Sequence, residues 1–267
     1  VILDRHLHAL ADEPESDARN TVVIAGGGFT GIETAADMPQ RLRAIFGDDA
    51  SIRVVILEQA DAIGPDLGPG PRPLIAEALH ALGVEVLTST AAAAIDAESV
   101  TTSAGERIPT RTVVWTAGAR ANPLAAQLPG EHDRFGRVQA DRELRANGVD
   151  DVFVTGDVAA AATDDAGNAT LMTCQHALSL GRIAGHNAAA ELLGLPTMPY
   201  SQPKYVTCLD LGPWGAVYTE GWEREVKLER AEAKALKRSI NTEWIYPPAA
   251  DREAAFAAAD PAFVVVA

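Results

Sequence analysis

The stretch TVVIAGGGFTGIE, residues Thr21–Glu33, decides the fold of this chain. It opens with a short apolar run of β-branched residues, which is typical of a buried parallel strand. Gly26, Gly28 and Gly31 follow with GxGxxG spacing, at the point where such a strand turns into a helix. The first glycine permits the tight turn, the second lets the backbone approach phosphates, and the third lets the helix pack on the strand. Because free N–H groups and the helix dipole favour negative charge there, the pattern predicts a dinucleotide pyrophosphate site.

The residues that follow the glycines support this interpretation. Residues 32–46 are compatible with a helix, residues 52–57 (IRVVIL) read as a second buried strand, and Glu58 closes that strand. An acid at this position accepts hydrogen bonds from the adenosine ribose and repels a 2′-phosphate, which favours NAD(H) over NADP(H). The separation between Gly31 and Glu58 exceeds the usual ~20 residues, and we attribute the excess to an extra turn at 46–51. The alternative is that Glu58 is a solvated carboxylate at a strand end.

Composition limits the classes of protein to which the chain can belong. Its 267 residues, 47% of them hydrophobic, can form more than one domain with a buried core. A net charge of -15 without a broad basic face argues against a nucleic-acid partner. Cys174 and Cys208 form no CxxC pair, which indicates a reducing compartment and no redox-active disulfide. We see no metal-ligand spacing, no signal peptide and no apolar run near the ~20 residues of a membrane span.

The chain begins at Val1 without an initiator methionine, in a segment that reads as the middle of a helix. We therefore expect further residues upstream in the natural protein, with a processed or engineered N-terminus as the alternative.

The order of strand-like and helix-like segments predicts an α/β fold with Rossmann-like dinucleotide-binding domains and a small α+β C-terminal region. After a short N-terminal helix, the expected strands are 21–25, 52–57, 84–87, 91–95, 100–102, 111–116, 138–144 (a strand with its flanking turn), 152–155, 205–211 and 215–219. The expected helices are 32–46, 74–82, 172–193, 223–240 and 251–259.

A second chemical signal follows the expected strand at 152–155, where Gly156 and Asp157 precede a loop and a long helix. An aspartate at the carboxyl end of a parallel strand can accept a hydrogen bond from a ribityl hydroxyl of a flavin. A plain Asx turn is the alternative.

Taken together, these segments resemble flavoproteins with two dinucleotide-binding domains, a superfamily that includes the disulfide reductases. More closely, the chain is similar to the type II NADH dehydrogenases, the single-subunit NADH:quinone oxidoreductases. The resemblance covers residues 1 to about 225 and rests on five features in the family's order. These are GGGFTGIE at 26–33, Glu58, VVWTAGARANPL at 113–124, VFVTGDVA at 152–159 and TCQHALSLGR at 173–182.

The resemblance implies a three-layer NAD domain inserted into an FAD domain. Residues 21–118 would form the NADH-binding domain and 119–193 the second segment of the FAD domain, followed by a C-terminal domain at 194–267. Residues 1–20 would be a linker at the end of the first FAD segment, whose own GxGxxG is expected upstream of Val1.

The resemblance also implies roles for single residues. The three glycines would hold the NADH pyrophosphate and Glu58 its ribose, while Glu33 would lie near the nicotinamide and flavin rings. For Glu33 the alternative is an acid favoured by the helix dipole. The other implied contacts are Ala117 and Gly118 at a turn close to both cofactors, Gly156 and Asp157 at the flavin ribityl chain, and Gln175 and Ala177 at the isoalloxazine near the quinone site.

The helix that begins near Gln175 departs from the family pattern. Ser179 stands where the family commonly has a second glutamine, which bears on the identity of the electron acceptor. His176 could deliver a proton to the acceptor, or could simply pack and bond locally. Cys174 is expected to be a small buried residue.

The segment 223–238 carries six cations with interleaved glutamates. It reads either as a basic amphipathic helix on an anionic membrane or as an ordinary charged surface helix. Trp244 and Tyr246 beside it could be interfacial anchors or could seal a small C-terminal domain.

The implied function is that of an FAD-dependent NADH dehydrogenase, an oxidoreductase that passes hydride from NADH to flavin and electrons on to a quinone. Two alternatives stay open: an NADH-dependent reductase of a small redox protein, and a non-catalytic NAD-binding module. We expect a cytoplasmic protein, with peripheral contact to the inner face of the cell membrane and a homodimer as open alternatives.

Overall fold

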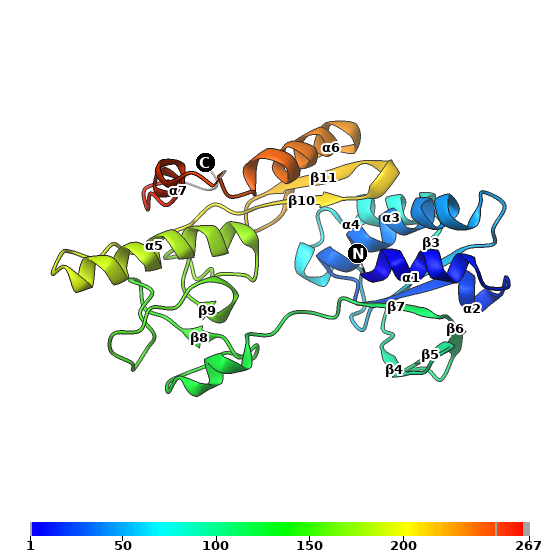
Figure 1. The fold of residues 1–267 in the computed structure, drawn as a ribbon, viewed down its shortest axis with the longest axis horizontal. Helices are drawn as coiled ribbons and strands as arrows, with labels where there is room; N and C mark the ends of the chain where they lie inside the picture. Colours follow the sequence, from blue (N-terminus) through cyan, green and yellow to red (C-terminus); the bar gives the residue numbers. More distant parts are fainter. Residues whose placement is uncertain (1, 249, 264–267) are drawn as a thin grey trace. The chain divides into compact units, whose positions relative to one another are not determined.

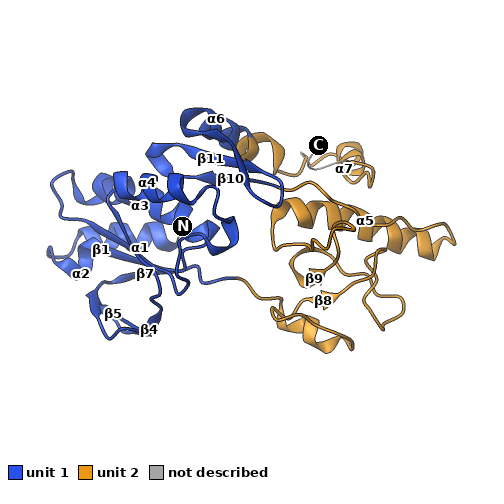
Figure 2. Cartoon of the chain, turned by 180° about the vertical axis from the view of Figure 1, so that it is seen from behind, with its two compact units in different colours: residues 1–118, 206–239 blue, residues 119–205, 240–267 orange. Residues whose placement is uncertain are grey.

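The computed structural model describes residues 2–248 and 250–263. It divides into two compact units, shown in Figure 2. Unit 1 comprises residues 1–118 and 206–239, and unit 2 comprises residues 119–205 and 240–267. Each unit is described by itself.

Unit 1 is built on a four-stranded parallel sheet with the order β3-β2-β1-β7, whose outer strands β3 and β7 are labelled in Figure 1. Its strands are β1 (Thr21–Ala25), β2 (Arg53–Leu57), β3 (Val84–Leu87) and β7 (Thr112–Trp115). All five residues of β1 are buried, as its continuous apolar sequence predicts for a central strand. The parallel order confirms the predicted α/β class.

Helices cover one face of this sheet and a small antiparallel sheet covers the other. The helices are α1 (Ile2–Ala11), α3 (Phe29–Phe46) and α4 (Arg72–Ala81), with a 3-10 turn at Pro65–Leu67, and a short helix α2 (Asp17–Asn20) directly precedes β1. Ile32 and Leu42 of α3 pack with Ile24 and Ile56 of the sheet. On the opposite face, β4 (Ala92–Ile95), β5 (Ser99–Thr102) and β6 (Arg107–Pro109) form the antiparallel sheet. The strand β6 was not among the expected elements, because three residues ending in proline carry little periodic signal.

The C-terminal part of unit 1 adds a second antiparallel sheet and a helix. Its elements are β10 (Val206–Asp210), a 3-10 turn (Gly212–Trp214), β11 (Ala216–Glu220), β12 (Glu225–Glu229) and α6 (Arg230–Ser239). Leu209, Leu211 and Val217 join the core formed with α3. The expected helix at 223–240 is therefore wrong over its first part. Residues 225–229 alternate between exposed and half-buried, and their pairing with β11 outweighs their helix propensity.

Unit 2 consists mainly of a long helix, α5 (Cys174–Leu192), together with very short strands and isolated β-bridges. Its strands β8 (Val138–Gln139) and β9 (Ala159–Ala160) are two residues long and parallel. It also contains 3-10 turns at Pro123–Gln127 and Gly156–Val158, a π-helical turn (Ile240–Trp244) and α7 (Arg252–Ala258). Val138, Leu144, Val154, Leu180 and Ile183 belong to its core.

The segment 138–144, expected as a strand with its flanking turn, forms a strand at Val138–Gln139 followed by a turn. The strand expected at 152–155 is wrong, because this segment forms only an isolated bridge between Phe153 and Arg145. The backbone explains this, because Val154 N donates to Leu144 O at 2.9 Å and Ala146 N donates to Val152 O at 2.8 Å. The segment thus bonds to a nearby turn instead of extending a sheet. Among the described residues, no helix has the length and apolar character needed to cross a bilayer.

Candidate functional site

The three glycines of the predicted site lie between β1 and α3, and each occupies a different environment. Gly26 has φ +112°, and a Cβ there would lie 2.7 Å from the carbonyl oxygen of Thr116. A Cβ on Gly31 would lie only 1.9 Å from the carbonyl oxygen of Gly26. A Cβ on Gly28 would meet nothing within 4 Å. Two glycines are therefore required by packing, while the backbone at Gly28 faces open space at the start of α3.

Glu58 closes β2 beside this turn. Its Oε2 accepts a hydrogen bond from Gly27 N at 2.7 Å, and its Oε1 accepts one from Ala60 N at 2.7 Å. The side chain is only 6% exposed, so the alternative of a solvated carboxylate does not hold. Two backbone donors fix the carboxylate next to the glycine turn.

The turn after β7 completes this edge of the sheet. A Cβ on Gly26 would lie 2.9 Å from Ala117 Cα, and Thr116 Oγ1 donates to Gly26 O at 2.9 Å. Gly118 follows with φ +89° and donates its N–H to Thr116 O at 2.8 Å. The carboxyl ends of β1, β2 and β7 thus bring the three glycines, Glu58 and Ala117 to one edge, where open parallel sheets bind ligands.

Glu33 lies in the first turns of α3, and its carboxylate bonds to the C-terminal part of unit 1. Its Oε1 accepts from Asp210 N at 2.8 Å and pairs with Lys237 Nζ at 2.9 Å. Lys237 Nζ also donates to Cys208 O at 2.9 Å. The helix dipole alone therefore does not account for Glu33, because the side chain joins α3 to β10 and α6. Sequence reasoning missed Lys237 as its partner, since no local pattern links positions so far apart.

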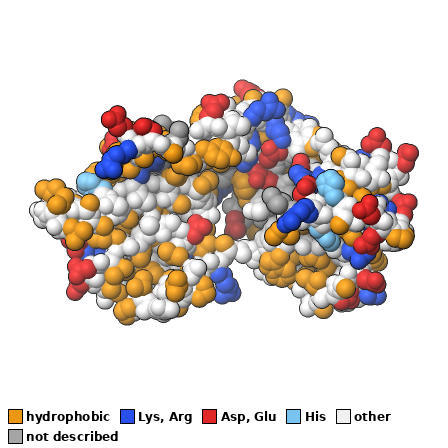
Figure 3. All heavy atoms as spheres, viewed as in Figure 1, with side chains coloured by type: hydrophobic (Ala, Val, Ile, Leu, Met, Phe, Trp, Pro, Cys, Tyr) orange, Lys and Arg blue, Asp and Glu red, His pale blue; other side chains and the backbone are white. Residues whose placement is uncertain are grey.

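The basic residues near α6 are largely engaged within unit 1. Figure 3 shows Lys and Arg side chains gathered over α6 with acidic side chains beside them. The ion pairs are Lys227–Glu225 at 2.7 Å, Arg230–Glu77 at 2.5 Å, Lys234–Asp210 at 2.6 Å and Lys237–Glu33 at 2.9 Å. Internal pairing neutralises these four cations, which weakens the case for a basic face directed at a membrane.

The second predicted site belongs to unit 2. Gly156 (φ +65°) and the exposed Asp157 lie in the 3-10 turn that packs against α5. A Cβ on Gly181 of α5 would be 3.8 Å from Thr155 Oγ1, so small residues line this contact. Gln175 and Ala177, both half-buried, occupy the first turn of the same helix. Unit 2 therefore contains the turn and the helix start to which the family resemblance gives a flavin-binding role.

His176, which follows Gln175, is fully buried. Its Nδ1 lies 3.2 Å from Leu171 N, which donates to it, and its ring stacks on Tyr205 with centroids 5.1 Å apart. An Nδ1 that accepts a backbone hydrogen bond carries no proton, so the contact favours the neutral imidazole. These contacts fit the alternative of local packing.

The two cysteines differ from each other in exposure. Cys174 is exposed, so the expectation that it is buried is wrong; it is the first residue of α5, where the chain enters the helix from a loop. Cys208 is buried in β10, and burial raises the pKa of its thiol to about 11. Among the described residues, no three His, Cys, Asp or Glu side chains gather as a metal site.

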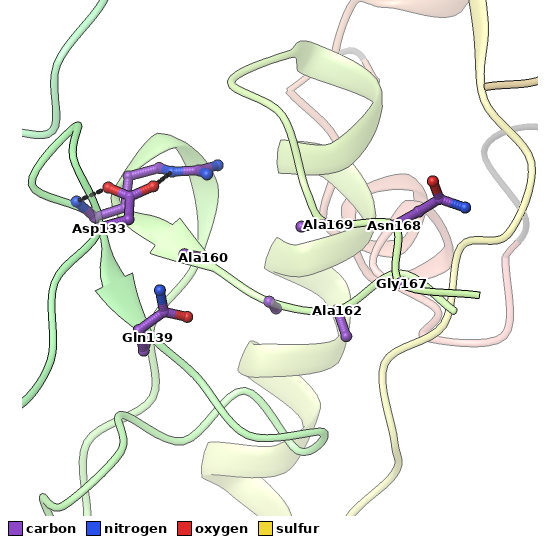
Figure 4. A pocket seen from close by; sticks show the side chains of 9 residues that line it. Asp133, Gln139, Ala160, Ala162, Gly167, Asn168 and Ala169 are labelled. Atoms are coloured by element: carbon purple, nitrogen blue, oxygen red, sulfur yellow. Dashed lines mark hydrogen bonds and ion pairs between the residues drawn. The ribbon is translucent and has the colours of Figure 1, made fainter. Parts of the chain in front are cut away.

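Unit 2 also has a cavity of about 340 Å³ that the sequence did not indicate (Figure 4). Asp133 lies on one side of it and the backbone around Asn168 lies on the other, and Arg137 also lines it. Arg137 Nε donates to Asp133 at 2.7 Å and Nη1 donates to Thr170 O at 2.6 Å. Burial opposes ionisation of Asp133, but hydrogen bonds from Arg137 and Phe135 outweigh it and lower the carboxyl pKa. The Arg137 guanidinium that lines the cavity is thus already paired with Asp133.

Comparison with known proteins agrees with this architecture. The chain is 48% identical over 250 residues to NADH dehydrogenase-like proteins from two strains of Mycobacterium tuberculosis, a match that covers 93% of this chain and 62% of each relative. It is 33% identical over 165 residues to the type II NADH:quinone oxidoreductase of the same species, which covers 56% of this chain and 36% of that protein. The chain thus spans less than two thirds of the length of these relatives.

A solved structure of NDH2 from Plasmodium falciparum in complex with NADH has the same fold, with a TM-score of 0.68 at 13% identity. The superposition covers 95% of this chain and 68% of that one. Residues 4–181 match the family model for pyridine nucleotide-disulphide oxidoreductases. By this match and by its fold, the chain belongs to the pyridine nucleotide-disulphide oxidoreductase family.

Proposed function

We propose that this protein is an NADH dehydrogenase that uses FAD and reduces a quinone. The observation that carries the proposal is the edge of unit 1, where the glycine turn opens at Gly28 and Glu58 is fixed beside it. The name of the type II NADH:quinone oxidoreductase relative supports the choice of acceptor.

In this proposal the backbone N–H groups at the start of α3 bind the NADH pyrophosphate. The open space at Gly28 allows the approach, and the helix dipole adds a favourable charge interaction. Glu58 accepts hydrogen bonds from the adenosine ribose and disfavours a 2′-phosphate by charge repulsion.

Residues of unit 2 would hold FAD. Asp157, which is exposed, would accept from a ribityl hydroxyl, and the first turn of α5, with Gln175 and Ala177, would contact the ring system. When bound, FAD would supply the redox chemistry: it can accept hydride from NADH and pass electrons on to the acceptor. The protein's contribution is to bind and orient the two nucleotides.

A second candidate, the NADH-dependent reductase of a small redox protein, is favoured by Ser179, which replaces the family's second glutamine on α5. Comparing turnover with a short-chain quinone and with a rubredoxin-type protein distinguishes the two. Faster turnover with the protein acceptor would favour this second candidate.

Peripheral membrane contact is a further proposal, supported by the exposed side chains of Trp244 and Tyr246. Sedimentation with anionic and neutral lipid vesicles tests it, and a protein that stays in the supernatant with both would contradict it.

The central experiment mixes the full-length protein anaerobically with NADH and then with a short-chain quinone. We expect NADH to bleach the flavin absorbance and the quinone to restore it. A flavin spectrum that NADH leaves unchanged would contradict the proposal.

The choice of nucleotide is tested by Glu58→Ala, which should reduce the preference for NADH over NADPH. Glu85→Ala is the matched control, because Glu85 lies on the neighbouring strand β3 and pairs with Arg53 at the surface. An unchanged preference in Glu58→Ala would count against the assignment of Glu58.

A further inference from the structure

The loop that follows Glu58 is attached to the glycine turn of unit 1. Gly64 N donates to Gly27 O at 2.9 Å, and a Cβ on Gly27 would lie 2.7 Å from Ile63 Cδ1. Ile63 is 8% exposed and Leu67 is 4% exposed, so the loop is anchored in the core. A displacement of residues 63–70 would therefore be transmitted to the turn and to Glu58.

The outer side of this loop rests against the turn between β11 and β12. A Cβ on Gly68 would lie 3.3 Å from Arg224 Cγ, and a Cβ on Gly70 would lie 2.8 Å from Arg224 O. Arg224 is only 6% exposed although it lies at a hairpin turn. The absence of side chains at Gly68 and Gly70 lets the two segments approach this closely.

Arg224 also adopts an unusual backbone conformation, with φ +58°. For a residue with a long side chain the left-handed region is energetically unfavourable. Such a conformation persists where the surrounding contacts determine it. Here those contacts include the loop that adjoins the glycine turn, together with the hydrogen bond from Arg224 N to Gly221 O at 3.2 Å.

We propose that Arg224 is a positioning residue that sets the affinity of the site for the adenosine half of NADH. This inference rests on the proposed NADH site. Arg224 acts through the loop 63–70 and holds Gly27 and Glu58 where the ribose and pyrophosphate bind, with no contact to the nucleotide itself. Preorganisation of this kind improves affinity because less ordering remains to be done on binding.

The test is Arg224→Gly, which removes the side chain and accommodates the left-handed backbone. The matched control is Arg230→Gly, because Arg230 has φ +59° and begins α6 directly after β12, where its side chain pairs with Glu77. Dissociation constants of the full-length protein are measured for NADH and for reduced nicotinamide mononucleotide, which lacks the adenosine half.

We expect Arg224→Gly to weaken NADH binding about tenfold and to leave the mononucleotide affinity unchanged. The KM for NADH should rise while kcat at saturating NADH is retained. Arg224→Lys should restore much of the affinity, since its aliphatic stem can still cover Gly68. Arg230→Gly should alter neither affinity.

Gly70→Ala provides a second variant should Arg224→Gly fail to fold. The φ of Gly70 is not in the left-handed region, so its backbone tolerates alanine, while the new Cβ separates the loop from Arg224 O. It should show the same selective loss of NADH affinity.

Unchanged NADH affinity in folded Arg224→Gly and Gly70→Ala would overturn the inference and leave the proposed function intact. Equal losses for NADH and the mononucleotide, or an equal effect of Arg230→Gly, would overturn it too, because they indicate general destabilisation. A wild-type protein that does not bind NADH would overturn the proposed function together with this inference.

Discussion

The two predicted nucleotide sites are built in different ways. In unit 1 the glycine turn connects a fully buried strand to an 18-residue helix, and a four-stranded parallel sheet supports it. In unit 2 Asp157 lies between a segment with one isolated bridge and a strand of two residues. The first site is determined by close backbone packing, whereas the second depends on a turn resting on a single helix.

This difference shows where each site is sensitive to substitution. In unit 1 a methyl group added at Gly26 or Gly31 would meet backbone atoms, so fold and binding are linked at these two positions. In unit 2 the side chain that we propose to bind the flavin, Asp157, is exposed, so its replacement should reduce binding with little effect on folding.

The largest expected effect is that of Gly31→Ala. Its Cβ would lie 1.9 Å from Gly26 O, and the strand and helix must separate, which should lower the free energy of unfolding by about 3 kcal/mol. Gly28→Ala is the matched control: its Cβ meets nothing, so stability should change by less than about 0.5 kcal/mol while NADH affinity falls. Denaturant unfolding measures the stability of the two variants, and NADH titration measures their affinity for NADH. Equal stability of the two variants would refute the distinction.

Asp157→Ala should come next, with a loss of FAD affinity of about tenfold or more. Folding should be little affected because the side chain is exposed. Asp165→Ala is the control, since Asp165 is an exposed acid of the same unit that pairs with Arg142. Flavin content after gel filtration gives the result, and full retention of FAD by Asp157→Ala would contradict the assignment.

A smaller effect is expected for Lys237→Met. It leaves the partly buried Glu33 without its cation and should cost about 1–2 kcal/mol of stability. Lys227→Met removes an exposed pair with Glu225 and should cost less than about 0.5 kcal/mol. Thermal unfolding of both variants at low and high salt compares them. If the two unfolding midpoints shift by the same amount, the Glu33–Lys237 ion pair stabilises the protein no more than the exposed pair does.

The smallest effect concerns the two thiols. At pH 8 an alkylating reagent should label the exposed Cys174 readily and the buried Cys208 slowly. The pKa of Cys208 is about 11 in the folded state, above its ordinary value of 9.0, so its ionisation favours the unfolded chain. Its contribution to stability is therefore complete below pH 9 and is lost as the pH rises towards 11. Mass spectrometry of wild type and Cys174→Ser checks the labelling, and fast labelling of Cys208 in the folded Cys174→Ser protein at pH 8 would contradict it.

The same contrast explains how far the sequence alone could lead. The glycine turn and Glu58 could be located because their constraints are local: a spacing of glycines and an acid directly after a strand. β12 was misread because EVKLE suits a helix until it pairs with β11. The segment 152–155 was misread for the opposite reason, because an apolar β-branched run forms a ladder only where a neighbouring strand is available. Neither the Glu33–Lys237 contact nor the contact of Arg224 with Gly70 has a local signal, since both join residues far apart in the chain.

The division of unit 1 into residues 1–118 and 206–239 has a consequence for biosynthesis. The ribosome releases the parallel sheet long before β10 and β11, the region whose Leu209, Leu211 and Val217 complete its core. Until then a nascent chain exposes the apolar surface of α3 that Leu209, Leu211 and Val217 later cover. Closing such a long-range contact is slow relative to local folding, and apolar surface that stays exposed during this interval favours aggregation of a newly made polypeptide.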